Sequence, residues 1–398
     1  MRSDTFELHG GATHAAGETA PDLRPSQRLA AIERHPHGGV HTTHLRALGI
    51  GADDILDASV NSNPYGPPPG LLETLREALT GDLLARYPDP EAMLLAEALA
   101  AHVGAQPEHI LVGNGSAELF WALALAYLDA GDEALILGPA FGEYAVASQV
   151  AGARALTILP PIQPERGWEP DALVSAVRAA PQAKIVWLAN PANPTGQYLD
   201  RRTVEAALDA FEGLLILDEA YVNFVAQSWN SLPLIETGRV ALARSLTKDY
   251  ALAGLRLGYV LADSRIITRL RQVRIPWSVN ALAQVAGQVA LESGDFISQS
   301  RQRLLSDRRA LQRDLDALGW ACVPTATHYF SARIPDGWQD ARAVKEALLR
   351  RGLMVRDCAS FGLSRYARIA TRLPAQNERI VAHLAALTTG EDGEERSP

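Results

Sequence analysis

The most constraining feature of this sequence is a series of short apolar runs, each of which ends in polar residues. The runs AKIVWLA, GLLILD and RVALARS lie at 183–189, 213–218 and 239–245, and segments with helical patterns separate them. Strands that are apolar at nearly every position are typical of a parallel sheet covered by helices on both faces. The sequence therefore predicts an α/β fold whose large domain contains a mostly parallel sheet.

The pattern changes after about residue 292, where a long charged helix begins. Short apolar stretches and a second helical segment follow it, and together they predict a smaller α/β domain at the C-terminus. A chain of 398 residues is long enough to hold two such lobes. We expect a loose N-terminal extension over 1–33, an arm that contributes to the small domain over 34–89, the large cofactor-binding domain over 90–292, the small domain over 293–390 and a tail over 391–398.

Composition and charge exclude several classes of function. The formal net charge is −9, which disfavours a basic footprint for nucleic acid. No segment is apolar enough to span a membrane, and the N-terminus has acidic residues in place of an apolar signal region. The chain has only two cysteines, which suits a reducing compartment. We therefore expect a cytoplasmic protein with no nucleic-acid or membrane partner.

Chemically distinctive side chains follow the predicted strands. The segment SLTKDYALAGLRLGY places Ser245, Lys248 and Arg256 directly after one of them. A lysine can form a Schiff base with an aldehyde, and a nearby serine and arginine can bind a phosphate at the other end of the same ligand. Taken alone, Lys248 is more commonly an exposed surface lysine. The spacing nevertheless indicates a ligand that carries both groups.

Other strand ends add groups that suit the same ligand. Asp218 ends the strand LLILD, where a buried carboxylate needs a cation such as a protonated pyridine nitrogen. The segment GNGSAE opens a helix at Ser116, whose N-terminus can bind a phosphate, and NPANPTG presents the amide of Asn193. Taken alone, these features are ordinary caps and turns. Because ligands bind at the carboxyl ends of parallel strands, their joint occurrence predicts a pyridoxal phosphate site.

The segments NPANPTG, DEAY and SLTKDYALAGLRLGY resemble the aspartate aminotransferase superfamily, fold type I of the pyridoxal phosphate enzymes. The resemblance extends over nearly the whole chain from about residue 35. It implies that Lys248 binds the cofactor aldehyde covalently and that Asp218 pairs with the pyridinium nitrogen. Tyr221 and Asn193 are implied to hydrogen-bond the ring oxygen. The residues implied for the cofactor phosphate are Gly115, Ser116, Ala117, Ser245 and Arg256.

The same resemblance assigns the aromatic residues near the cofactor. Phe141, in GPAFGEY, is implied to stack on the cofactor ring, and Tyr144 is the weaker candidate. Tyr87, in RYPD, is implied to reach the phosphate bound in a neighbouring subunit. A homodimer with shared active sites is therefore expected.

Within the superfamily, four stretches resemble the L-threonine-O-3-phosphate decarboxylases of cobalamin synthesis more than the histidinol-phosphate aminotransferases. They are HGG at 37–39 with NSNPYGPPP, SLTKDYA, IPWSVNALAQ and VRDCASFGLSRYARIATRLPAQNERI. The long extension before HGG and the variant turn GNGSAE depart from that pattern. A phosphorylated amino-acid substrate is implied, and guanidinium forks match phosphate and carboxylate oxygens. The residues implied to hold its anionic groups are His37, Asn63, Arg356, Arg368 and Arg372.

Three functions remain open at this stage. The first is decarboxylation of L-threonine O-phosphate to (R)-1-amino-2-propanol O-phosphate and CO2; threonine phosphate and serine phosphate are not distinguished. The second is transamination of histidinol phosphate or a similar amine. The two reactions differ in which bond at the amine carbon stands perpendicular to the cofactor ring, the bond to the carboxylate in the decarboxylase and the bond to hydrogen in the aminotransferase. The third is a non-catalytic pyridoxal phosphate module, as in some transcription regulators. The acidic charge and the intact Lys248, Asp218 and Arg256 disfavour it.

Overall fold

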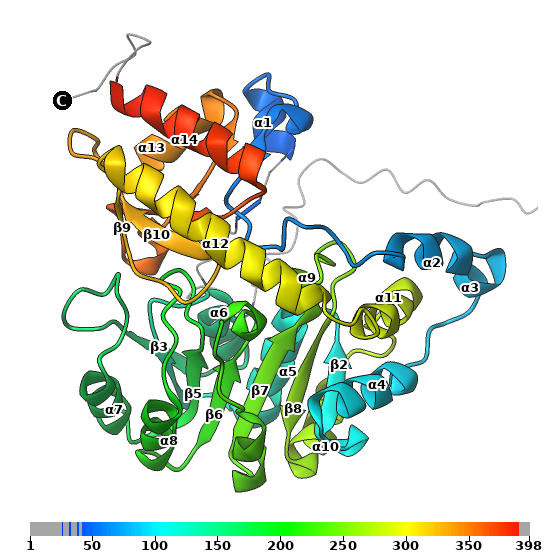
Figure 1. Ribbon diagram of the computed structural model, residues 1–398. Coiled ribbons are helices and arrows are strands. Elements are labelled where there is room, and N and C mark those ends of the chain that lie inside the picture. The colour runs from blue at the N-terminus through cyan, green and yellow to red at the C-terminus, as the bar shows by residue number, and fades with distance from the viewer. Residues whose placement is uncertain (1–25, 27–31, 33–37, 40–41, 390–398) are drawn as a thin grey trace, which may run out of the picture.

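The computed structural model describes residues 26, 32, 38–39 and 42–389 (Figure 1). Its largest sheet has the strand order β2-β8-β7-β6-β5-β3-β4. Only β8 runs antiparallel to its neighbours, so the predicted α/β fold with a mostly parallel sheet is confirmed. The strands are β2 (Ile110–Gly113), β3 (Glu133–Leu137), β4 (Arg154–Ile158), β5 (Ala183–Ala189), β6 (Leu214–Asp218), β7 (Val240–Ser245) and β8 (Gly258–Ala262).

Helices cover both faces of this sheet, which explains why its strands are apolar at nearly every position. In β5, Ile185 and Trp187 point into one core, and Val186 and Leu188 point into the other. The helices that pack into the first core are α5 (Ser116–Tyr127), α6 (Glu143–Val150) and α10 (Ser264–Val273). Those that pack into the second are α4 (Met93–Val103), α7 (Pro170–Arg178), α8 (Arg201–Asp209) and α11 (Ala281–Leu291).

A second, antiparallel sheet has the order β12-β13-β10-β9 and encloses its own core around Trp320, Phe330 and Ile369. Its strands are β12 (Arg356–Asp357), β13 (Tyr366–Ala370), β10 (Tyr329–Arg333) and β9 (Ala321–Cys322). The helices beside it are α12 (Phe296–Ala317), α13 (Ala341–Arg350) and α14 (Pro374–Thr389). In Figure 1, α12 runs diagonally along the boundary between the two parts of the molecule.

The N-terminal segment contributes to both parts. After α1 (Thr42–Ala47), strand β1 (Leu56–Asp57) pairs in parallel with β11 (Leu353–Met354), next to the second sheet. Further along, α2 (Leu71–Ala78) packs against α11 beside the large sheet, and α3 (Gly81–Ala85) follows it (Figure 1). The segment between β1 and α2 therefore passes from one part to the other, close to their boundary.

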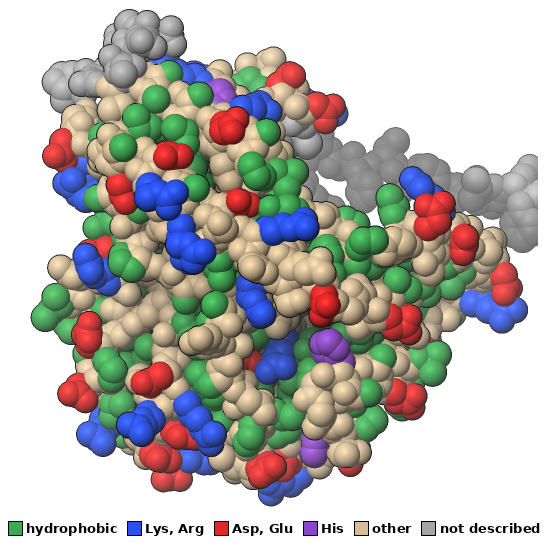
Figure 2. Space-filling model, in the orientation of Figure 1, with side chains coloured by type: hydrophobic (Ala, Val, Ile, Leu, Met, Phe, Trp, Pro, Cys, Tyr) green, Lys and Arg blue, Asp and Glu red, His purple; other side chains and the backbone are tan. Residues whose placement is uncertain are grey.

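The surface carries charges of both signs. On the face shown in Figure 2, lysine and arginine side chains alternate with acidic ones over both parts of the molecule. Within the described ranges, no helix is long and apolar enough to cross a bilayer. The same residues contain no group of three or more His, Cys, Asp or Glu side chains with the geometry of a metal site.

Candidate active site

Two adjoining cavities open at the carboxyl ends of β5, β6 and β7, where a parallel sheet binds ligands. The inner cavity has a volume of about 110 Å³ and reaches Ser116 and Asp218. The outer cavity, of about 310 Å³, extends towards Arg356 and Arg368 on the second sheet. The residues that line both are Ala117, Phe141, Asn193, Tyr221, Lys248 and Arg256. One side of this space thus suits a ring with a phosphate, and the other suits an anionic substrate.

Lys248 lies where the two cavities meet, because the chain turns sharply after β7. Ser245 caps the short helix α9 (Leu246–Asp249), and its Oγ accepts a hydrogen bond from Thr247 N at 3.3 Å. The carbonyl of Lys248 accepts a hydrogen bond of 2.8 Å from Asn63 N, which fixes the turn against the N-terminal segment. Among the described residues that line the cavities, Lys248 is the only lysine. It is therefore the group available to an aldehyde bound there.

Asp218 is the last residue of β6 and lies at the inner end of the site. Tyr144 Oη donates a hydrogen bond to its Oδ2, and Ala220 N donates to Oδ1 at 2.9 Å. Burial raises the pKa of Asp218 to about 6, although these two hydrogen bonds favour the ionised form. A cation placed beside the carboxylate would offset the cost of burying its charge, as a protonated pyridine nitrogen would.

The aromatic side chains near the site have separate positions. Phe141 lines both cavities, so its ring is available to a ligand. Tyr144 is buried, and its ring stacks on Trp187 with centroids 5.0 Å apart and 7° between the planes. Its hydroxyl is committed to Asp218. The geometry thus favours Phe141 over Tyr144 as the residue that stacks on a cofactor ring.

The turn before α5 forms a cradle for a phosphate. Gly115 has φ = 79°, and a Cβ at this position would lie 2.8 Å from Arg256 Nη2. A Cβ at Gly258 would lie 2.7 Å from Ser116 N, so both glycines leave room beside the helix N-terminus. Backbone N–H groups at the start of this 12-residue helix, together with the Arg256 guanidinium, make an anion site. These residues fit the phosphate of the predicted cofactor.

The predicted role of Ser245 in binding the cofactor phosphate stays a prediction. Ser245 does not line the inner cavity; its Oγ lies 2.5 Å from Thr247 Oγ1, and Thr247 is the hydroxyl residue that lines the cavity. Thr247, which stands directly before Lys248, was not among the predicted site residues. Ser245 thus contacts a cavity-lining hydroxyl directly.

Asn63 and Arg372, which were predicted to hold the substrate, line neither cavity. The Asn63 amide donates to Asp249 O at 2.9 Å and Ser300 Oγ at 3.0 Å, and its Oδ1 accepts from Tyr65 N. Arg372 donates to Ser62 O at 3.4 Å. Their predicted contacts with a substrate stay predictions.

The residue of this segment that does reach the site is Asn61, which sequence analysis did not single out. It lines the outer cavity, and its Nδ2 donates to Tyr221 Oη at 3.3 Å. Its Oδ1 is buried and has no hydrogen-bond partner among the described residues. The sequence signal for Asn61 is the alternation of side chains in an extended chain. It places Asn61 and Asn63 on one side and Ser62 on the other, but it does not show which of the two asparagines faces the cavity.

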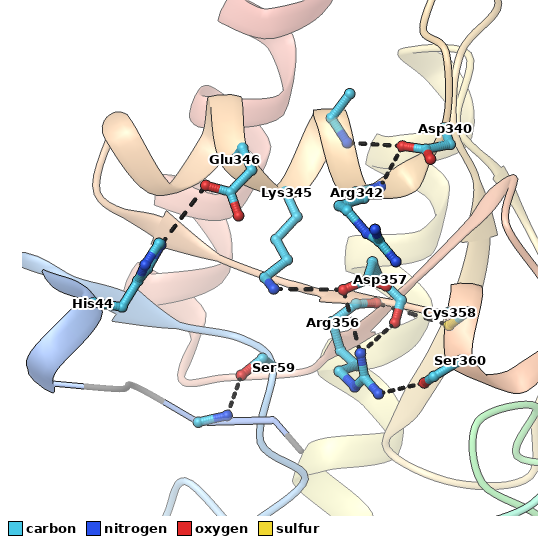
Figure 3. Close-up of polar contacts among 12 residues, drawn as sticks. His44, Ser59, Asp340, Arg342, Lys345, Glu346, Arg356, Asp357, Cys358 and Ser360 are labelled. Carbon is cyan, nitrogen blue, oxygen red and sulfur yellow. Dashed lines mark hydrogen bonds and ion pairs between the residues drawn. The ribbon is translucent and has the colours of Figure 1, made fainter. Parts of the chain in front are cut away.

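Two buried arginines from the second sheet face the outer cavity. Arg356 on β12 and Arg368 on β13 are directly paired across the strands, with exposed fractions of 4% and 5%. Arg356 Nη2 donates to Ser360 Oγ at 2.7 Å, and its Nη1 donates to the carbonyl of Asp357 at 2.8 Å (Figure 3). Burial lowers the pKa of Arg356, the Asp357 carboxylate opposes this shift, and the positive charge of Arg368 adds to it. The pair forms a positive wall whose charge is partly offset by Asp357 Oδ2, 3.3 Å from Arg356 Nη1.

Arg368 extends from that wall towards the inner cavity. Its Nη1 donates to Asn193 Oδ1 and its Nη2 donates to Ser59 O. Its Nε is buried and has no hydrogen-bond partner in the part of the chain that the structure describes. Gly38, from the HGG motif, lines the outer cavity, whereas the predicted substrate residue His37 lies outside the described residues.

Tyr87 lies away from both cavities of its own chain. Its side chain is 80% exposed and stacks on Trp277, with ring centroids 4.6 Å apart. Its predicted contact with a phosphate in a neighbouring subunit stays a prediction.

Comparison with known proteins identifies the family. The sequence pattern of the class I and II aminotransferases matches residues 53–384. The chain belongs to the class I and II aminotransferase family. It is 36% identical over 376 residues to a histidinol-phosphate aminotransferase of Moorella thermoacetica, covering 92% of this chain and 93% of the relative. It is 34% identical over 369 residues to a threonine-phosphate decarboxylase of Salmonella typhimurium, covering 90% of this chain and 98% of the relative.

A solved structure agrees with this assignment. Histidinol-phosphate aminotransferase from Sinorhizobium meliloti, in complex with pyridoxal 5'-phosphate, superposes with a TM-score of 0.82 at 26% identity, covering 93% of this chain and 98% of that one. The resemblance to fold type I enzymes is thus confirmed, and pyridoxal 5'-phosphate is the cofactor of this family member. The relatives differ in reaction, so the family alone does not decide between transamination and decarboxylation.

Proposed function

We propose that this enzyme decarboxylates L-threonine O-phosphate to (R)-1-amino-2-propanol O-phosphate and CO2, a reaction of cobalamin biosynthesis. The observation that carries the proposal is the buried cross-strand pair of Arg356 and Arg368 at the outer cavity. Like charges directly opposite each other in a sheet are destabilising. The Asp357 carboxylate offsets part of this cost at Arg356, and a bound anion would offset the rest. L-threonine O-phosphate offers two anionic groups, a phosphate and a carboxylate, close to the amine that must reach Lys248.

The inner cavity contains the groups that hold the cofactor. Pyridoxal phosphate, when bound, accepts the electrons released as a bond to the substrate's amine carbon breaks. Lys248 supplies the amine that holds the cofactor and afterwards carries a proton, and Asp218 keeps the pyridine nitrogen protonated. Tyr221 Oη accepts a hydrogen bond from Asn61, which leaves its own proton for the ring oxygen. The residues for the cofactor phosphate are Gly115, Ser116, Ala117, Thr247 and Arg256.

The outer cavity decides how the substrate lies. Arg368 is fixed by Asn193 and Ser59, and Arg356 is fixed by Ser360, so neither guanidinium has to be ordered when substrate binds. Held at both anionic groups, the substrate has little freedom to rotate about its amine carbon. We infer that this grip would orient the substrate so that the carbon–carboxylate bond is the one activated when the cofactor is bound. The relative from Salmonella typhimurium that is named a threonine-phosphate decarboxylase supports this choice.

One observation favours the aminotransferase alternative. Glu143 at the start of α6 lines the outer cavity, and its Oε2 accepts a hydrogen bond from Trp121 Nε1 at 3.3 Å. A carboxylate in this place would accept an N–H from the imidazole of histidinol phosphate, whereas it would repel a substrate carboxylate nearby. Other relatives, including that of Moorella thermoacetica, are named histidinol-phosphate aminotransferases.

The deciding experiment measures CO2 released per active site from L-threonine O-phosphate, with and without 2-oxoglutarate. Decarboxylation returns the cofactor in its aldehyde form, so repeated turnover without the oxo acid supports the proposal. Consumption of histidinol phosphate that depends strictly on 2-oxoglutarate, without release of CO2, would establish the aminotransferase. Turnover of neither substrate would point to a non-catalytic module. Lys248→Ala is the control, because it should abolish every reaction and the covalent attachment of the cofactor.

A further inference from the structure

Asp249 directly follows Lys248 and lies on the far side of the lysine turn from the ligand. It is 4% exposed and lines neither the inner nor the outer cavity. Its Oδ2 accepts a hydrogen bond of 2.5 Å from Asn223 Nδ2, and its Oδ1 accepts one of 2.9 Å from Tyr250 N. The carboxylate therefore connects the turn after β7 with the segment that follows β6.

The backbone of the same turn is connected to a third segment. Asn63 donates from its backbone N to Lys248 O at 2.8 Å and from Nδ2 to Asp249 O at 2.9 Å. The same amide reaches Ser300 Oγ on α12 at 3.0 Å. The two peptide groups that follow the Lys248 side chain are thus held from outside the cavity, by contacts that no ligand would displace.

The segments joined in this way carry functional groups of the site. Asn223 belongs to the short helix η4 (Val222–Phe224), which begins directly after Tyr221. Asn63 stands two residues after Asn61, and Asn61 donates to Tyr221 Oη. Asp249 consequently lies where the segments that present Lys248, Tyr221 and Asn61 meet. Its carboxylate contacts the segment of Tyr221, and its backbone carbonyl contacts the segment of Asn61.

Burying the Asp249 carboxylate at this connection is energetically unfavourable. The ionisable groups that face it across a small cavity of about 20 Å³ are His102, Glu219, Arg244, Tyr250 and Tyr259. The cation among them, Arg244, already pairs with Glu219 at 2.9 Å. Burial accordingly raises the pKa of Asp249 to about 7, against the hydrogen bonds from Asn223 and Tyr250 N. An amide would join the same segments without a buried charge.

We propose that Asp249 is a positioning residue for Lys248, which keeps the lysine amine aimed at the cofactor aldehyde by fixing its turn to the segments of Tyr221 and Asn61. The inference rests on the proposed role of Lys248. Loss of the carboxylate releases the turn from the segment of Tyr221 while Asn63 still holds its backbone, and the amine then samples orientations from which it does not reach the aldehyde. Covalent attachment of the cofactor slows before any substrate is present.

The test compares the wild type with Asp249→Ala, Asp249→Asn and the exchange Asn223→Asp/Asp249→Asn, which reverses the carboxylate and amide. Pyridoxal phosphate is added to each apoprotein, and the rate of attachment is followed by absorbance and by borohydride trapping. We expect Asp249→Ala to slow attachment roughly tenfold or more, because small misplacements of a reacting group are costly. The exchange should recover a rate within about threefold of the wild type, since the two sites are directly coupled.

A stability control separates positioning from a general loss of structure. Asp200→Ala removes the Oδ1 acceptor that caps α8 at Thr203 N, 2.8 Å away, far from the lysine turn. It should lower the melting temperature while attachment keeps its wild-type rate. If borohydride traps the cofactor on Lys248, and attachment is equally fast in the wild type, Asp249→Ala and Asp249→Asn, the positioning role of Asp249 is overturned while the role of Lys248 stands. Label on a different lysine in the wild type overturns the assignment of Lys248 as well.

Discussion

Tyr144 donates a hydrogen bond from its hydroxyl to Asp218 at the inner end of the ligand site. Stacking on Trp187 holds the tyrosine ring, and burial raises the pKa of Tyr144 well above its ordinary value, so the hydroxyl remains a donor. The hydrogen bond stabilises the ionised form of Asp218, whereas burial favours the protonated form. Tyr144, which also lines the inner cavity, thus helps to keep Asp218 negatively charged, as its proposed pairing with a pyridine nitrogen requires.

Tyr144→Phe should weaken cofactor binding in a pH-dependent way. Without the donor, the pKa of Asp218 rises above about 6, so less of the carboxylate is charged near neutral pH. If the pKa rises by about one unit, we expect affinity for pyridoxal phosphate to fall by roughly threefold at pH 6.5 and to recover towards pH 8. Fluorescence titration of the apoprotein measures this. Tyr127→Phe, on the far part of α5, is the control, and equal behaviour of the two variants would count against the coupling.

Asp218 should also make the apoprotein less stable as pH rises. Its pKa is raised from 3.8 to about 6 by burial, so the folded state holds the proton more tightly than the unfolded chain does. The stability contributed by the protonated form is complete below pH 4 and is lost as pH rises through 6. Relative to Asp218→Asn, the wild-type apoprotein should lose up to about 3 kcal/mol of unfolding free energy across this range. Urea denaturation at several pH values measures the unfolding free energy of both proteins. If the two free energies change with pH in the same way, the raised pKa of Asp218 is contradicted.

The two arginines of the outer cavity should act on the phosphorylated substrate. Arg356→Ala and Arg368→Ala should each lower kcat/KM for L-threonine O-phosphate by roughly 100-fold, because losing one side of a buried charge contact costs about 3 kcal/mol. Lysine at either position should fall between the wild type and alanine, since it keeps the charge without the fork. Steady-state assays with L-threonine O-phosphate and L-threonine measure the effect.

A matched control for the arginines is available on the same sheet. Arg333 on β10 is partly exposed and pairs with Asp336 at 3.0 Å on the surface. Arg333→Ala should leave kcat/KM for the phosphorylated substrate unchanged. If Arg356→Ala or Arg368→Ala affects L-threonine as strongly as its phosphate ester, the positive wall does not recognise the anionic groups of the substrate.

The apolar runs made the central sheet predictable, and the sheet made most of the site predictable. Parallel strands end at one edge, so Lys248, Asp218 and Asn193 had to converge once β5, β6 and β7 were recognised. Strand β8 was not recognised, because Gly258–Ala262 directly follows the phosphate-binding segment and continues its small apolar pattern. Its antiparallel direction follows from the short connection after β7, which leaves no room for a crossover helix.

Side-chain direction was the part that sequence could not supply. Ser245 and Thr247 are both hydroxyl residues near Lys248, and the conformation of a four-residue helix decides which of them faces the cavity. Asn61 and Asn63 occupy equivalent places in the pattern NSN, yet only Asn61 reaches the outer cavity. In each case contacts distant in sequence select the residue, so local pattern identified the segment but not the atom that faces the ligand.

The surface around Tyr87 bears on the predicted dimer. Tyr87 and Trp277 are both exposed and stacked on each other, and further large apolar side chains are exposed in neighbouring stretches, namely Leu84, Leu94 and Ile275. Solvent contact of such side chains is unfavourable, and exposed apolar clusters mark interaction sites. A symmetric partner that covers this surface would bring the Tyr87 hydroxyl to a neighbouring subunit, as the expected shared site requires.

Subunit complementation tests that shared site directly. Tyr87→Ala should weaken cofactor retention and activity, and Lys248→Ala should abolish activity, when each variant is assembled alone. In a hybrid dimer, one site combines an intact Lys248 from one subunit with an intact Tyr87 from the other, while the second site lacks both. An equal mixture that reassembles at random should therefore recover about a quarter of the wild-type activity per site, because about half of the symmetric dimers are hybrids. Mixtures with no more activity than Tyr87→Ala alone would show that Tyr87 serves its own chain or none.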